Sequence, residues 1–218
     1  MFYGETNLDD LADMQVTEDM YLLPNGNTLR DYITEKRYDK WRTRLLKHFN
    51  IDIDRLQHYI PFFILSSLQS GYLSTDHSMP LDKYLWDYAV AQGKIVAGIE
   101  SADFQYSVLK EISLDDQFKM LKDFISQPNK FKRRIETLNN LYKAQDIIQL
   151  YRSTRDSLGN QRRLLLHDRN VKMAQTILAN RDQPSFYTFG AAHLAGDKGV
   201  LPLLKRGGLL IKPTQVFD

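Results

Sequence analysis

The chain has 218 residues, of which 43% are hydrophobic and 26% charged, proportions typical of a globular protein with a substantial apolar core. Its formal net charge of +2 gives no strong field of either sign, so we expect no nucleic-acid partner. The sequence contains no cysteine, which excludes disulfides, thiolate metal sites and a cysteine nucleophile.

The first predicted element is a strand over residues 1–5, an aromatic run that passes through a glycine and ends on Glu5. Apolar residues at the spacing of one helix face then predict a helix that begins near Thr34. These residues are Tyr38, Trp41, Leu45 and Phe49.

The longest apolar stretch covers residues 59–68, far fewer than the ~20 residues of a membrane-spanning helix. We therefore expect a buried segment there and no membrane span. A further helix is predicted to end at Gly93. Its apolar stripe is predicted to be Leu81, Leu85, Tyr88 and Ala89.

Two more strands are predicted from the same sequence pattern: an apolar run that contains a glycine and ends on a polar residue. Residues 93–100 end on Glu100, and residues 185–193 end on His193. A fourth strand is predicted over residues 209–213. The remaining predicted helices span residues 113–125, 131–155, 167–182 and 200–206.

This order of elements predicts an α/β fold with a small central β-sheet built from N- and C-terminal strands. A large helical insertion covers about residues 28–182 and is interrupted by the strand near 94–100. We expect one domain over residues 1–218, because no linker or repeat divides the chain.

Three polar side chains are expected to meet at one edge of this sheet. If the strands run in the same sense, Glu5, Glu100 and His193 lie at its carboxyl edge, where open α/β sheets bind ligands. Gly190 and the two alanines after it remove side-chain bulk so that a ligand can approach. Two carboxylates and an imidazole suit a divalent metal ion, and they equally suit acid–base catalysis without metal.

A purely structural interpretation of the same residues is also open. His193 could be a hydrogen-bonded structural histidine, and the glutamates could pair with arginines or cap helices. The glycine spacing around His193 matches neither a phosphate-binding loop nor a dinucleotide fingerprint, and the chain contains no G-x-S-x-G nucleophile elbow.

Several segments resemble the TraB/GumN family, which is related to the Tiki metalloproteases. The most specific is "FYTFGAAHLAGDKGVLPLLKRGGLLIKP", which is similar to the family's apolar strand, its G-A-A-H-L motif, its G-x-x-G turn and its Leu-rich helix. Residues 79–105 match the family's G-x-E-[TS]-x-x-x-Q element, residues 169–177 its R-N pair, and residues 23–41 its T-L-R-D stretch.

The resemblance implies a metal-dependent hydrolase that acts on peptide bonds or a small-molecule substrate. The implied metal ion is Mn²⁺, Co²⁺ or Zn²⁺, held by His193, Glu100 and Glu5. Glu5, Glu100 and Arg169 are the expected catalytic residues, with Arg169 stabilising negative charge on the substrate oxygen. The expected substrate-binding residues are Asn170, Asp82 and Gly190.

The wider superfamily includes a haem-binding protein and an esterase, so the fold alone does not fix the chemistry. The alternative is therefore a non-catalytic protein that binds haem or a peptide at the same strand ends.

One departure from the family pattern concerns the start of the chain. The family begins with a strand that carries G-x-x-H, whereas "FYGETN" fits its second strand, the one that ends in glutamate. We therefore expect the first family strand and its histidine to be missing, which implies impaired catalysis in this chain alone. A missing strand would leave a sheet edge at which a homodimer could form. Export to the periplasm or cell envelope is expected if a targeting segment precedes the chain.

Overall fold

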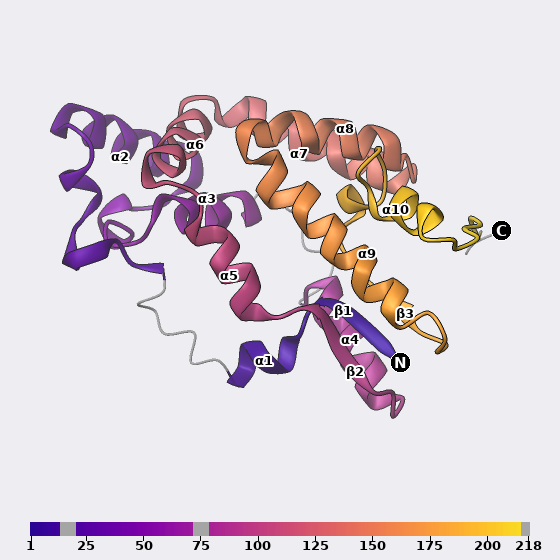
Figure 1. Ribbon diagram of the computed structural model, residues 1–218. Helices are drawn as coiled ribbons and strands as arrows, with labels where there is room; N and C mark the ends of the chain where they lie inside the picture. Colours follow the sequence, from indigo (N-terminus) through magenta and orange to yellow (C-terminus); the bar gives the residue numbers. More distant parts are fainter. Residues whose placement is uncertain (14–20, 72–78, 215–218) are drawn as a thin grey trace. The chain divides into compact units, whose positions relative to one another are not determined.

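The computed structural model describes residues 1–13, 21–71 and 79–214 (Figure 1). The chain divides into two compact units. The first unit comprises the described residues of segments 1–13, 77–109 and 138–218, and the second those of segments 14–76 and 110–137. The single domain expected from the sequence stays a prediction.

The first unit contains a three-stranded parallel sheet in the order β2-β1-β3. Its strands are β1 (Phe2–Thr6), β2 (Val96–Glu100) and β3 (Phe186–Tyr187). Phe2 is paired with Val96 and with Phe186, and Thr6 with Glu100. This arrangement confirms the predicted α/β class, with a small sheet assembled from strands far apart in the sequence. The predicted homodimer through a sheet edge stays a prediction.

Helices cover both faces of this sheet, as is usual for parallel strands. Successive side chains of β1 point to opposite faces, so Phe2 packs with Trp86 of α4 (Leu81–Ala91). Tyr3 packs on the other face with Met173 of α9 (Arg169–Ala179) and Val200 of α10 (Val200–Arg206). The same alternation turns Glu5 toward the α9 face.

The remaining helices of the first unit are α1 (Leu8–Asp13), α8 (Ile147–Leu158) and a π-helical turn (Arg163–Asp168) that leads into α9. The boundaries between the units fall within two helices, α5 (Ala102–Lys110) and α7 (Pro128–Lys143).

The described residues of the second unit are mainly helical, with one antiparallel bridge between Leu22 and Tyr59. Its long helices are α2 (Glu35–Phe49), α3 (Pro61–Ser70) and α6 (Leu114–Ser126). The predicted apolar face of α2 is buried at Tyr38, Trp41 and Leu45. The apolar segment 59–68 lies largely in α3, which buries Ile64, Leu65 and Leu68 as expected. Residues 114–126 confirm the predicted amphipathic helix, and the Ser113 side chain caps its first turn.

Two predicted elements differ in extent. The helix predicted over 131–155 is divided into α7 and α8, because Gln145 takes a left-handed conformation (φ 56°) and Asp146 caps α8 by accepting from Gln149 N–H at 3.0 Å. The strand predicted over 185–193 ends after Tyr187, and His193 lies in the 3-10 turn Ala191–His193.

Two further expectations are wrong, the second only in part. Residues 209–213 form no strand: Leu210 is 81% exposed, and the chain leaves α10 through two consecutive glycines without joining the sheet. The predicted apolar stripe of α4 is confirmed at Leu85 and Ala89 and is wrong at Leu81 and Tyr88. Leu81 and Tyr88 are exposed, whereas Trp86 and Ala89 form the buried face against Phe2.

Within the described residues, no helix has both the length and the apolar composition needed to cross a bilayer.

Candidate functional site

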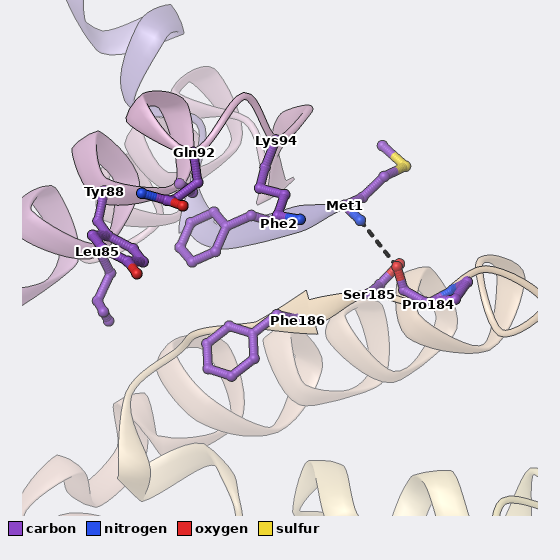
Figure 2. Close-up of a pocket in the computed structure, with 10 residues that line it drawn as sticks. Met1, Phe2, Leu85, Tyr88, Gln92, Lys94, Pro184, Ser185 and Phe186 are labelled. Atoms are coloured by element: carbon purple, nitrogen blue, oxygen red, sulfur yellow. Dashed lines mark hydrogen bonds between the residues drawn. The ribbon is translucent and has the colours of Figure 1, made fainter.

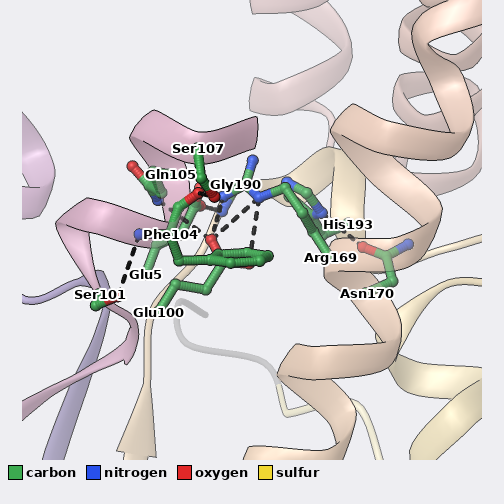
Figure 3. Close-up of polar contacts among 10 residues, drawn as sticks. All are labelled: Glu5, Glu100, Ser101, Phe104, Gln105, Ser107, Arg169, Asn170, Gly190 and His193. Carbon is green, nitrogen blue, oxygen red and sulfur yellow. Dashed lines mark hydrogen bonds and ion pairs between the residues drawn. The ribbon is translucent and has the colours of Figure 1, made fainter. Parts of the chain in front are cut away.

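The candidate site lies at the carboxyl ends of β1 and β2, where one arginine bridges two glutamates (Figure 3). Arg169 Nη2 lies 2.6 Å from Glu5 Oε1 and 2.7 Å from Glu100 Oε2. Arg169 Nε also donates to both oxygens of Glu100, at 3.2 and 3.0 Å. Both glutamates therefore pair with an arginine, as the structural interpretation expected, and they do so at the predicted edge of the sheet.

These charged groups are withdrawn from water to different degrees. The Glu100 side chain is 0% exposed, that of Arg169 14% and that of Glu5 25%. Burial alone would raise the pKa of Glu5, but the charge of Arg169, the Gly190 N–H and the nearby His193 together lower it. Burial would likewise lower the pKa of Arg169, yet its bonds to the two carboxylates raise it. Each charge is thus stabilised by its partners.

A second polar pair, His193 and Asn170, lies beside this network (Figure 3). His193 Nδ1 is 2.6 Å from Asn170 Oδ1, and Asn170 Nδ2 donates to the carbonyl oxygen of Lys198 at 2.7 Å. Burial lowers the pKa of His193 to about 4, although the charge of Glu5 acts in the opposite direction. The imidazole is therefore neutral at neutral pH.

Gly190 and Gln105 each donate a further hydrogen bond to one of the two glutamates. The exposed backbone N–H of Gly190 donates to Glu5 Oε2 at 2.8 Å, and Gln105 Nε2 donates to Glu100 Oε2 at 3.3 Å. A Cβ placed on Gly190 would lie 3.4 Å from His193 Cδ2 and 3.6 Å from Glu5 Oε2. The backbone of Gly190 is therefore next to both side chains.

The structure thus brings Glu5, Glu100, Arg169, His193 and Gly190 together at one edge of the sheet. Their catalytic and ligand-binding roles stay predictions. Asp82 is less closely integrated: it is exposed at the start of α4, and partial desolvation followed by repulsion from Glu5 raises its pKa.

Asn170 is fully buried, with both ends of its amide engaged inside the protein. Its expected role in substrate binding stays a prediction.

Two contributors were not identified from the sequence. Gln105 occupies the last position of the G-x-E-[TS]-x-x-x-Q element, so that motif offered a signal for it. The Lys198 carbonyl could not be identified in this way, because every residue has a backbone oxygen whatever its type.

The arrangement does not fit the divalent metal ion that the sequence implied. Among the described residues, no group of three His, Asp or Glu side chains is placed to hold an ion. The guanidinium of Arg169 lies between the two carboxylates expected to bind it. Its positive charge already supplies what a cation would supply to Glu5 and Glu100.

An apolar hollow of about 440 Å³ opens at the opposite, amino end of the strands (Figure 2). Phe2, Leu85, Tyr88 and Phe186 contribute much of its lining. No His, Asp or Glu lines it, so it offers none of the acidic or imidazole groups found at the carboxyl ends.

The fold and site together define an α/β protein with a small parallel sheet and a buried Glu–Arg–Glu network at its strand ends. The chain belongs to the TraB/PrgY/gumN family, whose model matches residues 2–213. This match confirms the family resemblance inferred from the motifs.

Among characterised proteins, the chain is similar to one named Metalloprotease TIKI homolog from Nematostella vectensis, with 21% identity over 276 residues. The alignment covers 98% of this chain but 59% of that protein, so the chain spans less than two thirds of its relative's length. No solved structure matches the chain.

Proposed function

We propose that this chain is a hydrolase whose reaction takes place at the carboxyl ends of β1 and β2. The observation that carries the proposal is a neutral, buried imidazole, that of His193, beside a largely buried arginine that is held in place by two glutamates. Perturbed ionisable groups gathered at one strand edge are typical of active sites in α/β proteins. The family and the name of the relative support the same class of reaction.

In this proposal the substrate is a peptide bond or a related acyl bond. A water molecule attacks the carbonyl carbon, and His193 Nε2 accepts a proton from that water. Glu5 stabilises the imidazolium that forms, because its negative charge favours a proton on the ring. His193 then returns the proton to the leaving nitrogen, so the imidazole is regenerated.

Arg169 is the proposed electrostatic stabiliser of the developing oxyanion. Its Nε and Nη2 donate hydrogen bonds to the glutamates, and no described residue accepts one from Nη1. That N–H group is available for a substrate oxygen, and the two carboxylates hold the guanidinium in a fixed orientation before the substrate arrives.

Hydrolysis dependent on Mn²⁺, Co²⁺ or Zn²⁺ stays a prediction. The described donor set does not fit such an ion, because Arg169 lies between the predicted ligands, so no step of the proposed reaction passes through one. Haem binding at the same edge is not favoured, because haem suits a planar apolar cleft with an axial ligand and this edge is charged.

The test is cleavage of fluorescently labelled casein and of a mixed peptide library by the unmodified chain and by His193→Gln. Parallel reactions contain a chelator or each of the three ions. We expect His193→Gln to lose at least about 100-fold in rate, since general base catalysis typically contributes that much.

His48→Gln is the matched control, because His48 is exposed at the end of α2 and makes no part of the site. It should retain full activity. Equal rates for the unmodified chain and His193→Gln, or no cleavage by any preparation, would contradict the proposal.

A further inference from the structure

We propose that Asn170 is a positioning residue that holds His193 with its proton on Nδ1, which leaves the lone pair on Nε2. The importance of that lone pair for catalysis rests on the proposed function, whereas the tautomer itself does not.

The backbone carbonyl of Lys198 can only accept a hydrogen bond. Asn170 Nδ2 lies 2.7 Å from that oxygen, so the amide nitrogen of Asn170 points toward it and donates. This fixes the orientation of the amide and turns Oδ1 toward the ring of His193. Because Oδ1 only accepts, Nδ1 at 2.6 Å must carry the proton.

The opposite arrangement would lose the hydrogen bond at the Lys198 end of the amide. A flipped Asn170 would place its oxygen against the Lys198 carbonyl and its NH₂ group against His193 Nδ1. Asn170 is 0% exposed and His193 7%, so water has little access to relieve the lost hydrogen bond. A buried acceptor facing another acceptor is costly, and this cost selects the observed orientation.

The other edge of the ring lies toward the charged network. His193 Cδ2, the neighbour of Nε2, is the ring atom nearest to a Cβ built on Gly190, which would also lie 3.6 Å from Glu5 Oε2. The negative charge of Glu5 by itself favours a proton on the near nitrogen. However, Glu5 already accepts from Arg169 and from Gly190 N–H, whereas Asn170 Oδ1 lies within hydrogen-bond distance of Nδ1, at 2.6 Å.

The glycine turn after His193 supplies the carbonyl on which this arrangement depends. Gly196 takes φ +84°, and Gly199 N–H donates to the Gly196 carbonyl at 2.7 Å, which closes the turn around Lys198. A Cβ on Gly199 would lie 2.6 Å from the Leu194 carbonyl oxygen. The G-x-x-G spacing therefore shapes the turn that presents the Lys198 carbonyl to Asn170.

The test is long-range ¹H–¹⁵N NMR of the histidine rings in the full chain at mildly alkaline pH, where the rings are neutral. The His193 signals are assigned by their absence in His193→Gln. We expect a protonated, pyrrole-type Nδ1 and an unprotonated, pyridine-type Nε2. In Asn170→Leu, which removes the acceptor at similar volume, the ratio of Nδ1–H to Nε2–H should fall at least about tenfold.

Asn170→Asp keeps an acceptor next to Nδ1 and should retain the Nδ1–H tautomer. Asn180→Leu removes an amide just after α9 that donates to the Thr176 carbonyl, and it should leave the His193 signals unchanged. Circular dichroism establishes which variants fold. If Asn170→Leu does not fold, the unmodified chain and Asn170→Asp decide the matter through their own tautomers.

A protonated Nε2 in the unmodified chain, or a tautomer ratio unaffected by Asn170→Leu, would overturn the proposal. This readout needs no substrate, so its failure is distinct from a failure of the proposed hydrolysis. If both are correct, Asn170→Leu also lowers the hydrolysis rate by about the same factor as it lowers the Nδ1–H population.

Discussion

At the scale of single residues, Arg169 is the group on which the site depends. Glu100 is fully buried and Glu5 largely so, and buried carboxylates without a partner are unfavourable. One guanidinium stabilises both, through three contacts to Glu100 and one to Glu5. Removing Arg169 therefore leaves two like charges close together and away from water.

We predict that Arg169→Met lowers the free energy of unfolding by roughly 3–5 kcal/mol, the usual cost of leaving a buried charge unpaired. Urea unfolding at neutral pH measures it. Arg163→Met is the matched control, because Arg163 is 85% exposed in its pair with Asp168 and should leave stability unchanged. Two variants of equal stability would show that the network is not a buried ion pair.

The residues of this site could be predicted from the sequence, but most of the contacts between them could not. Glu5, Glu100 and His193 could be found because each follows a glycine-containing apolar run. The bridge by Arg169 could not, because it joins residues 69 positions apart in the case of Glu100 and 164 in the case of Glu5. Asn170 matched the family's R-N pair, but only its burial distinguishes a partner of His193 from a contact to substrate.

At the scale of elements, β1 and β2 were predictable and the end of the chain was not. Both strands combine an apolar run with glycine, and they pair from Phe2 and Val96 at one end to Thr6 and Glu100 at the other. Residues 209–213 have a similar composition, yet they follow Gly207 and Gly208 and remain outside the sheet. An apolar composition makes a segment able to form a strand. Whether it does so also depends on a free sheet edge to pair with, and the local sequence does not show whether one is available.

The pair Gly4 and Gly98 lies in register at the centre of the two strands. A Cβ on Gly98 would clash with the backbone nitrogen of Asn7 and would lie 2.6 Å from the Glu100 carbonyl oxygen. Because backbone atoms cannot rotate away as a side chain can, the end of β2 would have to move.

We therefore predict that Gly98→Ala is destabilised by at least about 2 kcal/mol and loses hydrolysis with it, since the shift displaces Glu100. Gly71→Ala is the control, because Gly71 has φ −66° and a Cβ there would make an ordinary contact of 3.5 Å. Thermal unfolding followed by circular dichroism compares the two. A Gly98→Ala protein as stable as Gly71→Ala would show that the two strands do not approach as closely as described.

At the scale of the whole molecule, the site couples folding to pH. The pKa of His193 falls from 6.5 to about 4 in the folded protein, so the unfolded chain binds more protons between these values. The stability associated with a neutral His193 is therefore complete above pH 6.5 and is lost as the pH falls toward 4. The lowered pKa of Glu5 acts in the same direction, in a range below its ordinary value of 4.5.

The fold holds a neutral imidazole inside this network, and the stability of two proteins measured as a function of pH tests this most directly. Urea unfolding of the unmodified chain and of His193→Gln, from neutral pH down to pH 4, follows the contribution of His193, because the lowered pKa of Glu5 places its titration at or below the acid end of this range. We predict that the unmodified chain loses about 3 kcal/mol more than His193→Gln over this range. Parallel pH profiles for the two proteins would contradict the claim, because His193 would then titrate alike in the folded and unfolded chain.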